Sequence, residues 1–114
     1  MDDCLFCKIV SGKIPSDRVF EDEEVYAFRD INPQAPTHVL IIPKRHIPSA
    51  AALTGDDAAV CGRLVVVAAR IAQECGMADR GFRLVLNSGE DGGQSVGHLH
   101  LHLLGGRKLG WPPG

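Results

Sequence analysis

The sequence has 114 residues, a formal net charge of −2 and 45% hydrophobic residues. This length fits one domain spanning residues 1–114, and the weak negative charge argues against a nucleic-acid partner, because such domains usually carry a basic stripe. No apolar stretch approaches the roughly 18 residues of a membrane span, so no membrane partner is expected.

The chain begins with the acidic residues Met1-Asp2-Asp3, which do not resemble a secretory signal, and we therefore expect a cytoplasmic location. Cysteine thiols are normally reduced in that compartment, so the four cysteines are not expected to form a disulfide framework. The closely spaced pair Cys4 and Cys7 then indicates metal or redox chemistry.

Hydrophobic patterning in chain order predicts five strands and two helices. A short amphipathic helical turn is expected within the first ten residues. The long helix is expected to begin after an N-cap at Thr54, with Asp57 in a near-capping-box position, and to end near Gly76. Strands are expected over 18–21, 25–30, 38–42, 82–87 and 98–102. This order predicts an α+β domain with a mainly antiparallel sheet.

The last predicted strand is the strongest functional signal, because it reads His98-Leu99-His100-Leu101-His102. Side chains alternate on a strand, so the three imidazoles would share one face and the leucines would face the core. Three possibilities follow: a metal site, a histidine nucleophile with helpers, or a polar solvated face. The third is disfavoured, because exposed strand faces are normally filled by other residue types.

The loop before this strand, residues 87–97, carries four glycines and two serines. Glycines allow successive N–H groups to point into one concavity, which suits an anion such as phosphate. Such a loop is often only a hairpin connection, but beside three histidines it indicates phosphoryl chemistry.

At this point the sequence resembles the histidine-triad (HIT) family, whose signature is His-φ-His-φ-His-φ-φ with φ apolar. Residues 98–104 match that signature in full, and the ending from Leu104 to Gly114 is similar to the branch called histidine-triad nucleotide-binding proteins. Further matching segments cover most of the chain: Ile14-Pro15, Phe28-Arg29-Asp30-Ile31, Pro36-Thr37-His38, Ile42-Pro43-Lys44-Arg45-His46, Asn87-Ser88-Gly89 and Gly92-Gly93-Gln94-Ser95.

The resemblance implies a HIT-like fold, a homodimer whose sheets join across the interface, and a purine nucleoside monophosphate or phosphoramidate as ligand. It implies that His100 is the nucleophile and that Trp111, in the C-terminal tail, reaches toward the partner's active site. The residues implied at the phosphate and leaving group are His38, His102, Asn87, Gly93, Gln94 and Ser95. Those implied at the ribose and purine are Asp30 for the ribose and Phe6, Ile9, Phe28 and Ile31 for the base.

The implied reaction is hydrolysis of adenosine 5′-phosphoramidates to AMP and an amine through a nucleotidyl-histidine, with Ser95 relaying a proton to the amine. This scheme requires no metal. Two alternatives remain: another enzyme of the superfamily, acting on dinucleoside polyphosphates or transferring nucleotides, and a non-enzymatic purine- or zinc-binding module.

Several bacterial histidine-triad proteins, which this chain resembles, carry a Cys₂His₂ zinc site that includes the first triad histidine. With His38, His100 and His102 assigned to the phosphate, His46 and His98 remain as ligands. We therefore expect structural zinc on Cys4, Cys7, His46 and His98. The alternative is a pair of free thiols near a mobile N-terminus.

Overall fold

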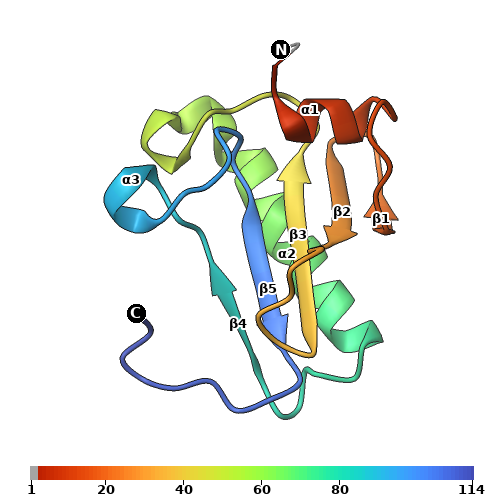
Figure 1. Ribbon diagram of the computed structural model, residues 1–114, viewed down its shortest axis with the longest axis vertical. Coiled ribbons are helices and arrows are strands. Elements are labelled where there is room, and N and C mark those ends of the chain that lie inside the picture. The colour runs from red at the N-terminus through yellow and green to blue at the C-terminus, as the bar shows by residue number, and fades with distance from the viewer. Residues whose placement is uncertain (1–2) are drawn as a thin grey trace.

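The central strand β3, Thr37–Pro43, is buried almost throughout and lies in the middle of the sheet. The computed structural model describes residues 3–114, so the acidic start Met1-Asp2 lies outside the described part. The strands lie in the order β1-β2-β3-β5-β4, and every neighbouring pair is antiparallel (Figure 1). The remaining strands are β1 Arg18–Glu21, β2 Val25–Arg29, β4 Phe82–Val85 and β5 Leu101–Gly105. The predicted five-stranded antiparallel sheet is confirmed.

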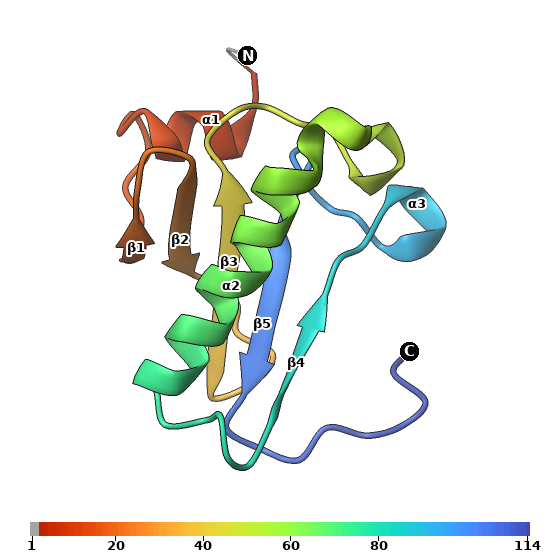
Figure 2. The ribbon, with the colours of Figure 1, turned by 180° about the vertical axis from the view of Figure 1, so that it is seen from behind.

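Alternate residues of the strands face two different apolar clusters. On one face, Val39 and Ile41 of β3 pack with the buried side of helix α2, Ala58–Glu74. On the other face, Leu40 and Ile42 pack with helix α1, Leu5–Val10. Figure 2 shows α2 running across the sheet on the face opposite the one seen in Figure 1. The two-residue period of β3 therefore separates the main core from the face that carries α1.

Helix α2 follows from its sequence pattern. Its buried positions recur at helical spacing, at Val60, Leu64, Val67, Ala68 and Ile71. The capping box at Thr54 and Asp57 is present, although it opens the 3₁₀ turn η2, Gly55–Asp57, that leads into the helix. A second 3₁₀ turn, η1, spans Ala50–Ala52. None of the helices in residues 3–114 has the length and apolar character needed to cross a membrane.

The histidine strand begins later than predicted, because β5 starts at Leu101 rather than at His98. The ladder with β3 ends at the pair Ile41 and Leu101. Before that point the backbone N–H of Leu99 donates to the carbonyl of Ile47, 2.7 Å away, which lies in the loop after β3. The leucines behave as predicted: Leu99, Leu101 and Leu103 are all buried in the main core.

The segment before the triad also differs from its prediction. Strand β4 ends at Val85 rather than Asn87, and a single helical turn, α3, Gly89–Gly92, lies within the expected loop. Gln94 closes this turn: its side-chain oxygen accepts from the N–H of Gly89 at 2.9 Å. Its amide nitrogen donates to the carbonyls of Pro48 and Val96.

The turn after β5 gives the first testable prediction. Gly106 has φ +92°, and a Cβ placed there would lie 2.9 Å from Cβ of Pro36, a rigid neighbour. Gly106→Ala should therefore lower the free energy of unfolding by about 1–3 kcal/mol. The free energy of unfolding is measured by urea titration of the variant and the wild type at equal protein concentration. Gly110→Ala is the matched control, because that position has open space and no positive φ. Equal losses in the two variants would contradict the prediction.

Candidate active site and metal centre

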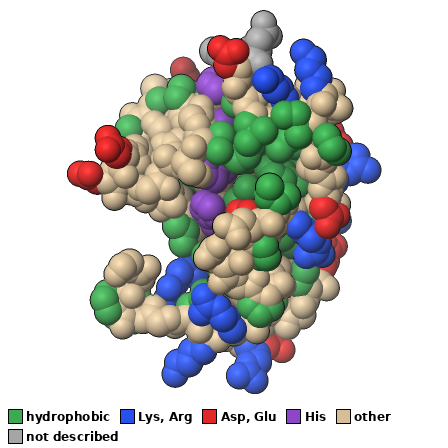
Figure 3. Space-filling view, in the orientation of Figure 1, with side chains coloured by type: hydrophobic (Ala, Val, Ile, Leu, Met, Phe, Trp, Pro, Cys, Tyr) green, Lys and Arg blue, Asp and Glu red, His purple; other side chains and the backbone are tan. Residues whose placement is uncertain are grey.

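A cavity of about 260 Å³ lies on the α1 face of the sheet. Its walls are mainly apolar and include Phe6 and Ile9 from α1 together with Phe28 and Leu40 from the strands. Figure 3 shows histidine side chains in the hollow of this face, directly beside a large hydrophobic area. The polar or titratable residues in the lining are Ser16, Arg29, Asp30, Ser95, His100 and His102. The cavity therefore joins an apolar chamber to a polar, histidine-containing end.

His100 is held in one orientation by the backbone of its own segment. Its Nδ1 lies 2.7 Å from the carbonyl oxygen of His98, and a carbonyl can only accept, so Nδ1 carries the proton. The other ring nitrogen, Nε2, then keeps its lone pair. The ring of Phe6 packs edge-on against His100 with centroids 5.1 Å apart. His100 is only 3% exposed, so its ring is both fixed and shielded.

His38 and His102 form a second fixed pair. Nδ1 of His38 accepts from the backbone N–H of Gln34 at 3.1 Å, so its Nε2 bears the proton. That Nε2 lies 2.9 Å from Nδ1 of His102 and 3.5 Å from a carboxylate oxygen of Asp30. His102 therefore accepts at Nδ1 and carries its own proton on Nε2. The chain of contacts leaves His102 with an N–H available to a ligand.

Both histidines of this pair are held neutral. Burial lowers the pKa of His38, although Asp30 opposes the shift. Burial, assisted by His100 and His38, lowers the pKa of His102 to about 4. Neutral imidazoles are what the hydrogen-bond chain requires, because a doubly protonated His102 could not accept at Nδ1.

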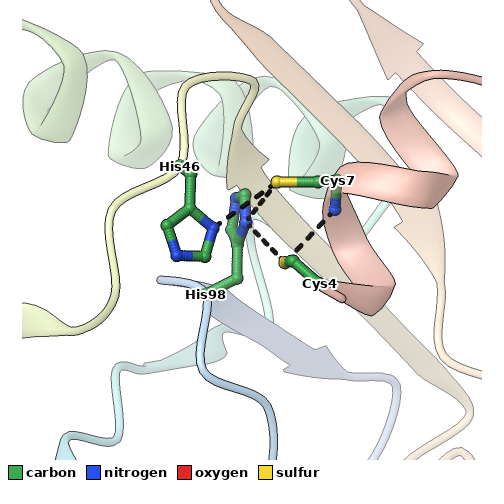
Figure 4. A group of neighbouring side chains, drawn as sticks. All are labelled: Cys4, Cys7, His46 and His98. Atoms are coloured by element: carbon green, nitrogen blue, oxygen red, sulfur yellow. Dashed lines mark hydrogen bonds between the residues drawn. The ribbon is translucent and has the colours of Figure 1, made fainter. Parts of the chain in front are cut away.

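Four side chains predicted to bind a metal converge at the N-terminal end of α1 (Figure 4). Cys4 and Cys7 come from the start of α1, His46 from the loop after β3, and His98 from the segment before β5. Each offers one ligand atom, and all four of these atoms lie within 4.8 Å of one another. This arrangement therefore agrees with metal binding. A redox-active pair of cysteines would not need the two histidines.

The separations of these atoms fit tetrahedral zinc. Sulfur–nitrogen distances of about 3.5 Å are expected when Zn–S is near 2.3 Å and Zn–N near 2.0–2.1 Å. Nδ1 of His98 lies 3.3 Å from Sγ of Cys4 and 3.6 Å from Sγ of Cys7. Nδ1 of His46 lies 3.4 Å from Sγ of Cys7. Nε2 of His98 donates to the carbonyl of Pro43 at 2.9 Å, which leaves its Nδ1 lone pair free for a metal.

The structure brings together most of the residues predicted for the nucleotide. Those in the cavity lining are Phe6, Ile9, Phe28, Asp30, Ile31, Ser95, His100 and His102. His38 lies behind His102, and Asn87, Gly93 and Gln94 lie outside the lining. Trp111 is 84% exposed in the C-terminal tail.

Several lining residues were not predicted: Leu5, Ile14, Pro15, Ser16, Leu40 and Val96. Leu40 could have been found, because it shares a strand face with His38 two residues earlier. Residues 14–16 could not, since they belong to a turn whose position depends on where α1 packs.

Comparison with known proteins agrees with this geometry. The family model described as HIT domain matches residues 11–109. The chain is 50% identical over 109 residues to the purine nucleoside phosphoramidase of Escherichia coli K12, covering 96% of this chain and 92% of the relative. It is also 50% identical over 113 residues to an uncharacterized HIT-like protein of Synechocystis, covering 99% and 98% of the two chains.

A solved structure shares the fold closely. The crystal structure of a HIT family hydrolase from Legionella pneumophila has a TM-score of 0.97 and 53% identity, covering 98% of this chain and all of that one. The full triad, the antiparallel sheet and these relatives lead to one conclusion: the chain belongs to the HIT domain family.

Proposed function

We propose that this protein is a purine nucleoside phosphoramidase that hydrolyses adenosine 5′-phosphoramidates through a nucleotidyl-histidine on His100. One observation carries the proposal: a histidine with a free Nε2 lone pair stands at the polar end of an apolar cavity. The Escherichia coli relative named purine nucleoside phosphoramidase supports the substrate class. That relative matches 96% of this chain and 92% of its own length, which supports the further proposal that residues 1–114 form one HIT domain.

In the first step, Nε2 of His100 attacks the α-phosphorus of the substrate. A P–N bond to His100 forms while the P–N bond to the leaving amine breaks, so one phosphoramidate replaces another. The hydroxyl of Ser95, which lines the same cavity, relays a proton to the departing amine. In the second step water attacks the phosphorus, AMP leaves, and His100 regains its lone pair.

The surrounding residues bind the ligand and the developing charge. The Nε2–H of His102, fixed through His38, donates to a non-bridging phosphate oxygen, as in an oxyanion hole. Asp30 accepts from the ribose hydroxyls, and Phe6, Ile9, Phe28 and Ile31 hold the purine. Asn87 and the Gly93 amide approach the phosphate from the loop. Gln94 acts indirectly, by holding the loop in shape. Its side-chain nitrogen donates to the carbonyls of Pro48 and Val96.

The Cys₂His₂ cluster is proposed to hold structural zinc. The ion takes no part in the reaction and would tie α1 to the segment that carries the nucleophile. Reduced thiols at Cys4 and Cys7 suit this role, and they accord with the predicted cytoplasmic location.

The protein is further proposed to be a homodimer whose sheets join across the interface. Strand β4 is at the edge of the sheet, where an unpaired strand readily accepts a partner. Exposed apolar side chains lie on α2, just after β4 and in the C-terminal tail, namely Val65, Val66, Leu86 and Trp111. Such exposed apolar groups mark an association surface.

The nucleophile is tested with His100→Ala and adenosine 5′-phosphoramidate. AMP release should fall by about 10⁴-fold or more, because no other described group offers the same free imidazole nitrogen to the cavity. Ser95→Ala should lose less, within about 10²–10⁴-fold, since only proton transfer is impaired. Initial rates of AMP formation measure both. Cleavage of dinucleoside polyphosphates alone by the wild type would instead favour the alternative enzyme class.

The half-buried, neutral His102 predicts a dependence of stability on pH. Its pKa is about 4 in the folded protein against an ordinary 6.5, so below pH 6.5 the unfolded chain binds more protons. The stability contributed by neutral His102 is therefore complete above about pH 6.5 and is lost as the pH falls toward 4. His102→Gln should unfold with a shallower pH dependence across this window, measured by urea titration. Identical slopes in the two proteins would refute the assignment.

Dimerisation is tested by sedimentation velocity. The wild type should sediment as a species of twice the 12.2 kDa chain mass. Val66→Glu, which places a charge on the exposed face of α2, should shift the population toward the monomer. Lys13→Glu, on a surface turn, is the control and should leave the dimer intact. A monomeric wild type at micromolar concentration would exclude the dimer.

A further inference from the structure

Helix α1 is a short element with two separate attachments to the rest of the protein. It has only six residues, Leu5–Val10, and a helix of this length has little stability of its own. Phe6 and Ile9 anchor it to the apolar cluster on β2 and β3. Its N-terminal end is anchored through Cys4 and Cys7 to His46 and His98.

The same helical turn therefore carries both a metal cluster and a wall of the cavity. Leu5, Phe6 and Ile9 line the cavity, whereas Cys4 and Cys7 point toward the two histidine ligands (Figure 4). Phe6 stands between the two cysteines in the sequence. Any displacement of the cysteines must move Phe6 as well, because one turn of backbone connects them.

Phe6 also contacts one ring of the metal-ligand cluster and two rings of the cavity lining. Its centroid lies 5.9 Å from that of the metal-ligand candidate His98 and 5.1 Å from that of His100. It lies 5.5 Å from that of Phe28 on β2, which also lines the cavity. Phe6 is only 3% exposed, so it has little freedom to shift alone.

We propose that metal binding and nucleotide binding are thermodynamically coupled through α1. A metal ion on Cys4, Cys7, His46 and His98 fixes the wall against which the purine packs. The nucleotide, in return, holds α1 in the position that completes the ligand set. This inference rests on the proposed function for the identity of the nucleotide. Because coupling between two binding sites is reciprocal, each ligand must raise the affinity of the other by the same factor.

The coupling should act on binding rather than on the chemical step. Without a metal, α1 keeps its apolar contacts, but its N-terminal end is held only by weak hydrogen bonds from thiols. The ring of His98 stays bonded to the carbonyl of Pro43, and its own carbonyl still fixes His100. Metal loss should therefore raise the dissociation constant for the nucleotide and leave the rate at saturating substrate nearly unchanged.

The experiment measures AMP binding by isothermal titration calorimetry in zinc-loaded and chelator-stripped wild-type protein. AMP should bind about 10-fold more weakly to the stripped protein, and Zn²⁺ should bind about 10-fold more tightly when AMP is saturating. Cys7→Ser should show the weaker AMP binding with no response to zinc. Cys75→Ser, an exposed thiol outside the cluster, is the matched control and should behave as the wild type.

Phe6→Ala separates this route from a general effect of zinc on stability. This variant keeps all four ligands, so it should still bind zinc, but the factor by which zinc strengthens AMP binding should fall toward one. Circular dichroism establishes that each variant is folded. Equal AMP affinities in loaded and stripped protein would overturn the coupling and leave the proposed phosphoramidase activity standing. No zinc uptake would overturn both the coupling and the proposed zinc site, again without touching that activity. Failure of the loaded protein to bind AMP would overturn both.

Discussion

The hydrogen bond from Nδ1 of His100 to the carbonyl of His98, 2.7 Å long, is the constraint on which the candidate site depends. An imidazole is a useful nucleophile only when one nitrogen is free and its ring does not rotate. This hydrogen bond meets both conditions, and its acceptor lies only two residues earlier in the chain. The acceptor, His98, lies just before β5, which starts at Leu101.

Burial makes the rest of the histidine network possible. Four of the five histidines make specific ring contacts that assign a proton to one nitrogen, and His38, His98 and His100 are each at most 6% exposed. In water such rings would exchange between tautomers and protonation states. Here desolvation lowers the pKa of His38, His98 and His102, and hydrogen bonds to backbone N–H and carbonyl groups select the tautomers. The fixed network then presents one lone pair and one N–H to the cavity, which are the two groups that an attack on phosphorus needs.

Much of this fold is contained in local sequence patterns, and the parts that are not have a common physical cause. The spacing of apolar residues in α2, its capping box and the burial of Leu99, Leu101 and Leu103 follow from local preferences, and the structure agrees with them. The start of β5 does not follow, because it is set by the bond between Leu99 and Ile47, residues far apart in the chain. The cavity residues Ile14 and Ser16 were missed for the same reason, since they line the cavity only once α1 has packed on β2 and β3. Alternation predicts all three histidines on the face opposite Leu99, Leu101 and Leu103, but it does not show that His98 meets Cys4 and Cys7 there.

The spacing of the three histidines explains how one short motif can serve two sites. Extended backbone rises about 3.3 Å per residue, so alternate side chains that share a face still reach different neighbours. The first ring precedes the ladder with β3 and lies beside Cys4 and Cys7, with its Nε2 bonded to the carbonyl of Pro43. The second ring is then oriented by the carbonyl of the first, and the third remains on the ladder beside His38. Under the proposed function, alternate positions of one segment would serve for attachment of α1, for nucleophilic attack and for charge stabilisation, and the spacing between them keeps the three roles apart.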